Sequence, residues 1–384
     1  MTGVRCIDRM RSPTASTDRG TQSQRDPDPA RPHFPGSWGR LQDRVPTLAL
    51  LRRVLNASDS KSELIGHSRS PVRPYRFMDW ATQGFLAIVA ILLVVFHRRA
   101  PAPWPWIVVG HVLAMVVIHR LVMSVAGGTR NPAVRFLREI YPMILYTAFF
   151  RETELVNTAI GIPRLDPHFL RLEDHLFGAQ PSVVLMSAIP SLWVSELLYA
   201  SYFAYYVMVV GTGLWLMTRN RSAFRHFISV VSFVFYACYL FYMAVPVIGP
   251  RLLFRATPEQ AWYAATYPLL PLPSIPESVQ QGPFFHLMAF IYRHFEAMSA
   301  AFPSSHVAIA VTTLWFSWRY LRPIRWIHAV AVVLLCISTV YCHYHYAVDV
   351  PAGILAAAVL IPLANWGYRR VDPEGEPVAL PHRR

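Results

Sequence analysis

Lysine is nearly missing from this sequence, in which Lys61 is the only one among 384 residues. Charged residues of all kinds make up 15% of the chain, against 54% hydrophobic and 13% aromatic residues. Soluble domains carry about 25% charged residues, so the scarcity of charge excludes an ordinary soluble protein. The composition predicts an integral membrane protein with several spanning helices.

The formal net charge of +14 comes from arginine rather than lysine. The arginines lie mainly in the first 76 residues and between the apolar segments, which is the distribution of a topology signal plus a basic tail. A nucleic-acid-binding surface fits this distribution less well, and we expect no nucleic-acid partner.

Cysteines are also few. Cys6, Cys238, Cys336 and Cys342 stand singly, and their spacing matches neither a disulfide framework nor a zinc site. We expect no bound metal and no cofactor.

Long apolar runs are missing from the first 75 residues, which are rich in Arg, Pro, Ser, Asp and Gln. A signal peptide needs such a run, so residues 1–77 are predicted to form a disordered basic tail in the cytoplasm. Met78 directly precedes the first apolar run and is an alternative start of translation. Beyond the tail we expect accessory transmembrane helices (78–137), a membrane core (138–370) and a cytoplasmic C-terminal tail (371–384).

A spanning helix needs about 20 mostly apolar residues. The predicted spans are Trp80–His97, Trp104–Met123, Leu192–Met217, Phe224–Val247, Ser305–Tyr320, Ile324–Tyr341 and Tyr346–Tyr368. Ile140–Phe150 is shorter and is either an eighth span or an interfacial segment. The stretch LDPHFLRLEDHLFGAQPSVVLM, which begins at Leu165, alternates apolar and charged residues with a helical period and is predicted to lie along the bilayer surface. The fold class is therefore an all-α polytopic membrane helix bundle of about seven or eight transmembrane helices.

Arginine placement orients these helices. Basic clusters at residues 219–225, 319–325 and 369–384 fall on one side if the helices alternate, and the positive-inside rule makes that side cytoplasmic. Residues 248–303 and 343–345 then face the opposite side. We accordingly expect a multi-pass protein of the cell inner membrane whose chemistry faces the extracytoplasmic side.

Three stretches on that outer side carry polar side chains. In the first, PVIGPRL, Gly249 and Pro250 are expected to end a helix and to leave Arg251 at the membrane surface. The guanidinium offers a planar fork to phosphoryl oxygens, although an arginine bound to lipid headgroups fits this stretch equally well.

The second stretch is AFPSSHVAIA, in which Pro303 is expected in the first turn of a helix. The backbone N–H groups of Ser304, Ser305 and His306 would then point out of the helix end and attract an anion. Taken alone, the serines fit an ordinary helix cap, and the histidine fits an interfacial side chain satisfied by water.

The third stretch is CHYHYAVDVPAG, in which His345 and Asp349 are four residues apart and would share one face of a helix. A carboxylate bonded to one ring nitrogen leaves the other nitrogen as a nucleophile or base. An acidic group at the rim of a membrane helix is costly without such a role. Pro351 suits a first turn, so the helix is expected to start near Tyr346. His343 is interpreted as a bystander or as a group that supports the site without touching the ligand.

The ordered set GPR, FPSSH and HYAVDV resembles the type-2 phosphatidic acid phosphatase superfamily, and within it the branch of inositol phosphorylceramide synthases and sphingomyelin synthases. The resemblance extends over roughly residues 140–368. It implies a six-helix lipid-phosphatase-like core, a membrane lipid as substrate, and a transient phosphohistidine. Inositol or another alcohol is then the expected acceptor, with water as the alternative.

Position by position, the resemblance implies that His345 is the nucleophile and that Asp349 orients it. His306 would be the general acid that protonates the leaving alcohol. The phosphate oxygens would be held by Arg251, Ser304 and the backbone of Ser305.

The chain departs from the phosphatase branch at three places. No lysine stands before the arginine, the pair Ser338–Thr339 stands where Ser-Arg is usual, and Ser305 replaces a glycine. These losses resemble the synthase branch, and they leave Arg255 or Arg293 as candidates for a missing positive charge.

We therefore expect a lipid phosphotransferase, with simple hydrolysis of lipid phosphates as the alternative. A transporter is a more distant alternative, because it would carry charges along a pathway and internal repeats. For such a pathway the sequence offers one marginal candidate, Glu196, near the outer end of its span, and no repeat. A metal-dependent hydrolase that uses the histidines as ligands is a further alternative, which chelator sensitivity would separate.

Overall fold

The computed structural model describes residues 74–295 and 300–372. All of these belong to one compact unit, Val54–Arg384. The tails predicted at 1–77 and 371–384 lie outside the described residues, apart from the few residues next to the first and last helices.

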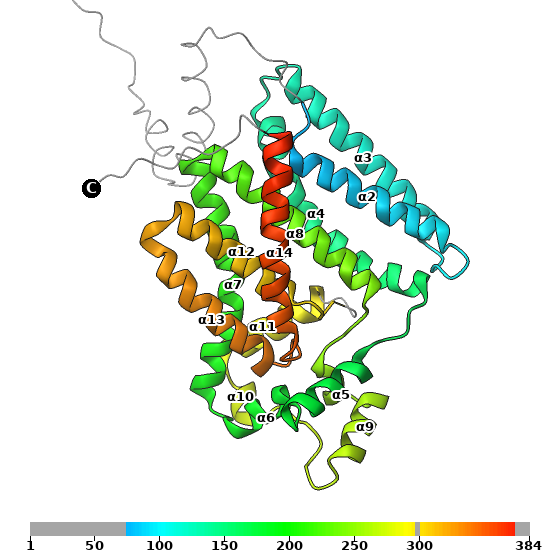
Figure 1. Ribbon diagram of the computed structural model, residues 1–384, viewed down its shortest axis with the longest axis vertical. Coiled ribbons are helices and arrows are strands. Elements are labelled where there is room, and N and C mark those ends of the chain that lie inside the picture. Colours follow the sequence, from blue (N-terminus) through cyan, green and yellow to red (C-terminus); the bar gives the residue numbers. More distant parts are fainter. Residues whose placement is uncertain (1–73, 296–299, 373–384) are drawn as a thin grey trace, which may run out of the picture. The chain divides into compact units, whose positions relative to one another are not determined.

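The predicted all-α architecture is confirmed, since the described residues form helices joined by loops, with no strand among them (Figure 1). The α-helices are α2 (Phe77–Val95), α3 (Trp104–Ala126), α4 (Pro132–Ile160), α5 (Asp166–Phe177), α6 (Pro181–Ala188), α7 (Leu192–Arg219), α8 (Arg221–Ala244), α9 (Pro258–Thr266), α10 (Glu277–Gln280), α11 (Pro283–Phe295), α12 (Ser305–Tyr320), α13 (Arg325–Tyr341) and α14 (Asp349–Val371). The 3-10 turns are η2 (Pro250–Phe254) and η3 (Arg322–Ile324).

Among the described residues, 6 helices are long and apolar enough to cross a membrane: α2, α3, α7, α8, α13 with η3, and α14. They confirm an integral, multi-pass protein. α12 has the predicted bounds, but its 16 residues reach only about 24 Å, short of the roughly 30 Å hydrocarbon layer. α4 extends the short apolar piece predicted at 140–150 into a helix of 29 residues with charged side chains toward both ends.

α8 lies at the centre of the bundle and packs against α2, α4, α7, α12 and α14 (Figure 1). In the most apolar 18-residue stretch of α8, 67% of the residues are buried. The same share is 17% for α3, which lies on the flank beside α2. A buried ion pair between Arg138 and Asp79 ties α2 to α4, and the hydroxyl of Tyr141 donates to the same carboxylate at 2.7 Å. α2 is thus anchored to α4 by a paired charge, as a charge inside a membrane bundle requires.

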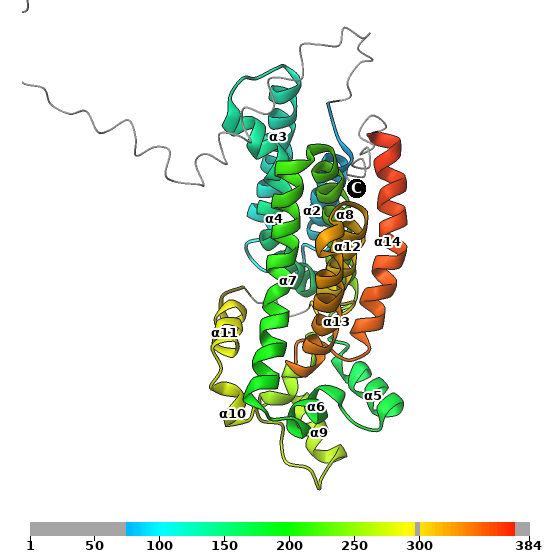
Figure 2. The ribbon, with the colours of Figure 1, turned by 90° about the vertical axis from the view of Figure 1, so that its left-hand side faces the viewer.

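The described parts of the three basic clusters, which for the third are Arg369 and Arg370, meet at one end of the bundle, as their positions in the sequence predicted. His226, in the first turns of α8, lies 3.5 Å from the hydroxyl of Tyr320, the last residue of α12. The other ring nitrogen of His226 lies 2.6 Å from Asn365, near the end of α14. The short helices α5, α6, α9 and α10 gather at the opposite end (Figure 2).

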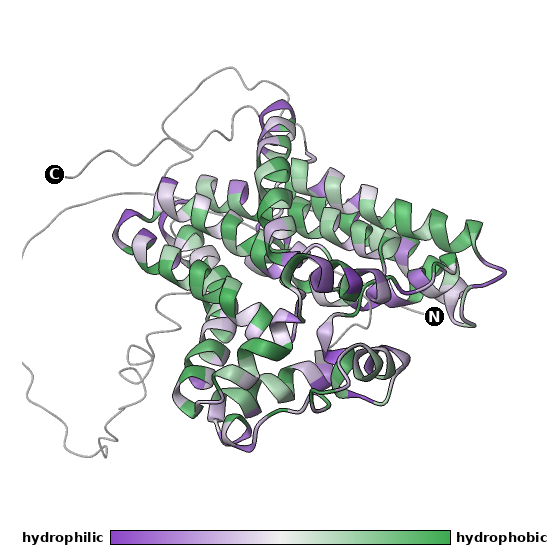
Figure 3. Cartoon of the chain, turned by 60° about the horizontal axis from the view of Figure 1, so that its bottom comes forward, coloured by the Kyte–Doolittle hydropathy of each residue, from purple (hydrophilic) through white to green (hydrophobic). Residues whose placement is uncertain are grey.

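Hydropathy follows the same division. Hydrophobic residues run along the long helices, while hydrophilic residues gather mainly at helix ends and on short elements of the end that comes forward in Figure 3. This pattern is that of helices whose sides face hydrocarbon and whose ends face water.

The predicted end of α8 is wrong. The helix was expected to run to Val247 and to be ended by Gly249 and Pro250, but it ends at Ala244. Val247 leaves the helix because it pairs with Ala300 in a parallel bridge, which only extended backbone can form.

α12 and α14 approach each other closely at Gly353. A Cβ atom at this position would lie 2.6 Å from the carbonyl oxygen of Ser304 and 3.0 Å from Cβ of Val307. Replacing Gly353 with Ala is therefore expected to force the helices apart and to cost about 1–3 kcal/mol of stability. Thermal unfolding of the purified protein in detergent measures this as a lower Tm.

The matched control is Gly211→Ala in α7, where a Cβ would meet nothing within 4 Å. It is expected to leave the Tm unchanged or raised, because alanine favours a helix over glycine by about 1 kcal/mol. Equal Tm values for the two variants would contradict the close approach at Gly353.

Candidate active site

The three polar stretches meet at the end of the bundle where α5, α6, α9 and α10 lie. The N–H of Ala301 donates to the carbonyl oxygen of Val247 at 2.9 Å, which joins the first stretch to the second. The N–H of Ser304 donates to the carbonyl oxygen of Asp349 at 3.3 Å, which joins the second to the third. Backbone hydrogen bonds thus join three stretches that are far apart in the chain.

The ring of His345 is held through one nitrogen. Its Nδ1–H donates to the carbonyl oxygen of Ala301 at 2.9 Å and lies 3.2 Å from Oδ2 of Asp349. Because a carbonyl oxygen can only accept a hydrogen bond, Nδ1 carries the proton and Nε2 keeps its lone pair. Burial, helped by the positive charge of Arg251, lowers the pKa of His345, so that the ring is neutral at pH 7.

Asp349 pairs with this histidine, but not on a helix. α14 begins at Asp349 itself, whereas the sequence predicted a start near Tyr346. The reason is that Oδ2 of Asp349 accepts the backbone N–H of Tyr346 at 2.9 Å, which closes a turn before the helix. The carboxylate is fully buried, and its Oδ1 has no hydrogen-bond partner among the described residues.

His306 is the second residue of α12. The hydroxyl of Ser304 accepts the N–H of Val307 at 3.3 Å and caps the helix, so Pro303 stands before the helix and not in its first turn as predicted. The ring centroid of His306 lies 5.7 Å from that of His345. Its Nδ1 is buried without a hydrogen-bond partner in the described part of the chain. An imidazole in this position can exchange a proton with a ligand bound between the two rings.

The two serines differ in their surroundings. Ser304 is fully buried, its hydroxyl serves the helix cap, and it does not line the cavity described below. Ser305 lines that cavity, but its N–H donates to the hydroxyl of Tyr242 at 3.0 Å. The N–H groups of both serines are therefore engaged within the protein, and Ser305 is the one of the two serines that lines the cavity.

Arg251 belongs to η2 and is placed by a stack of rings. Its guanidinium carbon lies 5.7 Å from the ring centroid of Tyr292. The ring of Tyr292 in turn stacks on Tyr344, with centroids 4.0 Å apart and planes 5° from parallel. Because Tyr344 directly precedes His345, this stack fixes the arginine relative to the histidine.

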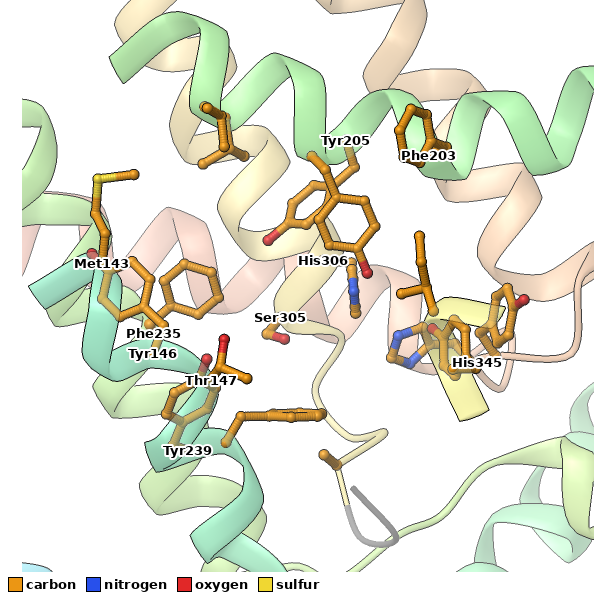
Figure 4. A pocket seen from close by; sticks show the side chains of 18 of the residues that line it. Met143, Tyr146, Thr147, Phe203, Tyr205, Phe235, Tyr239, Ser305, His306 and His345 are labelled. Atoms are coloured by element: carbon orange, nitrogen blue, oxygen red, sulfur yellow. The ribbon is translucent and has the colours of Figure 1, made fainter. Parts of the chain in front are cut away.

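A cavity of about 470 Å³ joins these groups. Its polar end is formed by Arg251, Ser305, His306 and His345. Figure 4 shows His306 between the side chains of α7 and the ring of His345. Apart from Thr147, the rest of the lining is apolar or aromatic. It comes mainly from α4, α7 and α8: Met143, Tyr146, Phe150, Phe203, Tyr205, Tyr206, Val209, Val210, Phe235 and Tyr239.

The departures from the phosphatase motifs leave little positive charge here. The hydroxyls of Ser338 and Thr339 donate to carbonyl groups of their own helix, both at 2.9 Å. Arg255 and Arg293 are exposed and lie outside the cavity lining. Within the described residues, Arg251 is the one arginine of that lining.

Two other residues singled out from the sequence lie outside the cavity. The ring of His343 packs against Phe254, with centroids 4.1 Å apart. The carboxylate of Glu196 accepts the N–H groups of Phe284 and Phe285 at 2.8 and 3.0 Å, and so caps α11. The described residues contain no group of three or more His, Cys, Asp or Glu side chains arranged to hold a metal ion.

The structure adds residues that the sequence analysis missed. Tyr242 donates its hydroxyl to the carbonyl oxygen of Pro303 at 3.0 Å while accepting the N–H of Ser305, and no sequence pattern announces it. Asp166 and Glu173 bind the loops of the site from α5. Their seven-residue spacing places both acids on the apolar face of an amphipathic helix. Acids are rarely buried on such a face without a partner, so the spacing could have indicated that α5 binds polar groups of the protein.

The family model of the PAP2 superfamily matches residues 168–363. This span runs from α5 to α14 and contains Arg251, His306 and His345. Neither the comparison with curated proteins nor the comparison with solved structures gave a match.

Proposed function

The chain belongs to the PAP2 superfamily, and on this premise we propose that it is a membrane-embedded lipid phosphotransferase. The observation that carries the proposal is the state of His345: its Nδ1–H is fixed by Ala301 and Asp349, which leaves the lone pair of Nε2. This nitrogen belongs to a side chain that lines the same cavity as Arg251 and His306. A nucleophile, a cation and an acid–base group are the parts that phosphoryl transfer needs.

In the first half-reaction, Nε2 of His345 attacks the phosphorus of the lipid substrate. The N–P bond forms while the P–O bond to the leaving alcohol breaks, and His306 gives its proton to the departing oxygen. A bound phosphoryl group is anionic, so it stabilises the imidazolium form of His306 that this step requires. Arg251 and the hydroxyl of Ser305 offset the charge on the equatorial oxygens.

In the second half-reaction, an acceptor hydroxyl gives its proton to the neutral His306 while its oxygen attacks phosphorus. The P–N bond breaks, His345 regains its lone pair, and His306 is again protonated. We propose inositol or another alcohol as the acceptor, in line with the synthase-like motif departures. Water in the same place would give hydrolysis by the same steps.

The apolar part of the cavity suits a hydrocarbon chain. Its rim includes the exposed side chains of Thr147 on α4 and Val210 on α7. α7 is one of the helices suited to span the membrane, so a lipid could enter sideways between α4 and α7 with its phosphate toward the histidines. The basic clusters lie at the other end of the bundle, and we place the site on the extracytoplasmic side of the cell inner membrane.

The test uses the purified full-length protein in detergent with a panel of labelled lipid phosphates, each with and without myo-inositol or glycerol. Label that moves to the alcohol only when the alcohol is present supports transfer. Release of inorganic phosphate at the same rate with and without an acceptor would replace the proposal with hydrolysis. No turnover of any lipid phosphate would reject both.

Metal removal is expected to have no effect on the proposed reaction. The steps above use only nitrogen, oxygen and guanidinium groups of the chain, so turnover in excess EDTA should equal turnover in its absence. The assay is the same transfer reaction after dialysis against the chelator. Loss of activity that Zn²⁺ or Mg²⁺ restores would contradict the histidine mechanism and favour a metal-dependent one.

A further inference from the structure

α5 was expected to rest on the bilayer surface, yet one of its faces is buried against the loops of the site. The buried residues of this face are Asp166, Leu170 and Glu173, whose spacing of four and three places them in one row. Two of the three are acids, and both are fully buried. Burial of a carboxyl group costs free energy unless hydrogen bonds compensate for the lost water. The hydrogen-bond partners of Asp166 and Glu173 therefore indicate the role of α5.

Asp166 is bonded to two of the site's loops at once. Its carboxylate accepts the backbone N–H groups of Gly249 at 2.9 Å and Ile248 at 3.1 Å, just before Arg251. The same Oδ1 accepts the hydroxyl of Tyr346 at 3.1 Å, one residue after the proposed nucleophile. One side chain therefore links the loop of the cation to the loop of the nucleophile.

Glu173 binds the second of these loops from two helical turns further along α5. Its Oε1 accepts the N–H of Ala347, which lies midway between His345 and Asp349. Burial raises the pKa of Glu173 to about 8, against the opposing effect of the Ala347 N–H and with the support of the neighbouring Asp349. At pH 7 the side chain is therefore a neutral acid, and glutamine is its close isostere.

The aromatic side chain of Phe169 extends these contacts to the remaining loop. Its ring centroid lies 4.8 Å from that of Phe302 and 5.6 Å from that of Tyr346. Leu170 packs in one apolar cluster with Val247 and other residues of the three loops. α5 thus touches every loop that carries a proposed functional group.

We propose that α5 is a positioning element of the phosphoryl transfer, in which Asp166 and Glu173 hold the loop of Arg251 and the loop of His345 in register. The inference rests on the proposed function, because the relative position of the two loops matters only if Arg251 and His345 act on one phosphoryl group. Neither acid touches the substrate; Glu173 acts through a backbone N–H group, and Asp166 acts through two backbone N–H groups and the hydroxyl of Tyr346. A displacement of about 1 Å in such a site can cost on the order of 100-fold in rate.

The test compares Glu173→Ala, Glu173→Gln and Asp166→Ala in the full-length protein. The two alanine variants are expected to lower kcat/KM by about 10- to 100-fold. They should weaken inhibition by orthovanadate in the same proportion, because vanadate adopts the five-coordinate geometry of the transition state. Glu173→Gln keeps the acceptor oxygen and should stay within about threefold of wild type.

The inhibition constant separates positioning from simple loss of folded protein. Fewer folded molecules lower the maximal rate but leave the vanadate inhibition constant unchanged. Glu277→Ala, which removes an exposed carboxylate from α10 at the same end of the molecule, is the matched control and should behave as wild type.

Wild-type vanadate inhibition in both alanine variants would overturn the positioning role while leaving the proposed function intact. A loss in Glu173→Gln as large as that in Glu173→Ala would also overturn it, because the acceptor oxygen would then be irrelevant. A wild-type protein that neither turns over lipid phosphates nor binds vanadate would reject the proposed function, and the positioning role with it.

Discussion

His345→Ala is expected to lower turnover of the lipid substrate by at least about 10⁴-fold, the size of effect that loss of a covalent nucleophile produces. The structure gives the reason: Nε2 of this ring carries the lone pair, and it belongs to the cavity that also holds Arg251 and His306. With a ³²P-labelled substrate, the wild type should retain label on the protein after alkaline quenching and lose it in acid. That behaviour is characteristic of a phosphoramidate bond, and the alanine variant should retain none.

The matched control is a histidine two positions away. His343 packs against Phe254 and does not line the cavity, so removing its imidazole should leave both turnover and labelling near wild type. Its φ of 62° is left-handed, and the control is therefore His343→Asn, because asparagine tolerates that conformation. Wild-type turnover in His345→Ala, or loss of labelling in His343→Asn, would contradict the assignment of His345 as the nucleophile.

Features that depend on neighbours in the sequence could be predicted. α12 runs over Ser305–Tyr320 as expected, because the apolar run and the capping serine before it are both local signals. The same holds for the start of α3 at Trp104 and of α7 at Leu192. The pairing of His345 with Asp349 was also predicted, since a four-residue spacing allows contact in a helix and, as it turned out, in a turn.

Features that depend on distant parts of the chain could not. α8 stops at Ala244 although the apolar run continues, because Val247 is needed for pairing with the segment before Pro303. Two of the three N–H groups expected to bind an anion at the start of α12 are engaged, that of Ser305 by Tyr242 and that of Ser304 by the carbonyl oxygen of Asp349. In both cases tertiary hydrogen bonds override what the local sequence favours.

α5 is a second example of a feature that depends on distant parts of the chain. Its helical period was visible, and the bilayer surface was a reasonable site for it. What the period cannot show is that Asp166 faces Gly249 and Tyr346 across the fold. A helix that lies on a membrane and a helix that packs on protein both have an apolar face. In α5 only the acids on that face distinguish the two cases.

His306→Gln is expected to lower turnover of an ordinary lipid phosphate by about 10²- to 10⁴-fold, the usual contribution of a general acid–base group. A substrate analogue whose leaving group is a nitrophenolate should lose much less in the first step, because that anion departs without a proton. The second step still needs a base for the acceptor hydroxyl, so the phosphohistidine on His345 should accumulate. Rapid mixing should therefore show a burst of nitrophenolate, close to one per active site, followed by a slow steady rate.

The dependence on the leaving group is what identifies an acid, because a purely structural role for His306 would slow both substrates alike. Equal losses for the alkyl and nitrophenyl substrates, with no burst, would contradict the assignment. The control is His286→Gln on α11, an exposed histidine outside the cavity lining, which should leave both substrates unaffected. Because Nδ1 of His306 has no hydrogen-bond partner among the described residues, no protein group there competes with the substrate for a proton on that nitrogen. The slow phase after the burst then reports on the second step, in which this ring takes the proton of the acceptor hydroxyl.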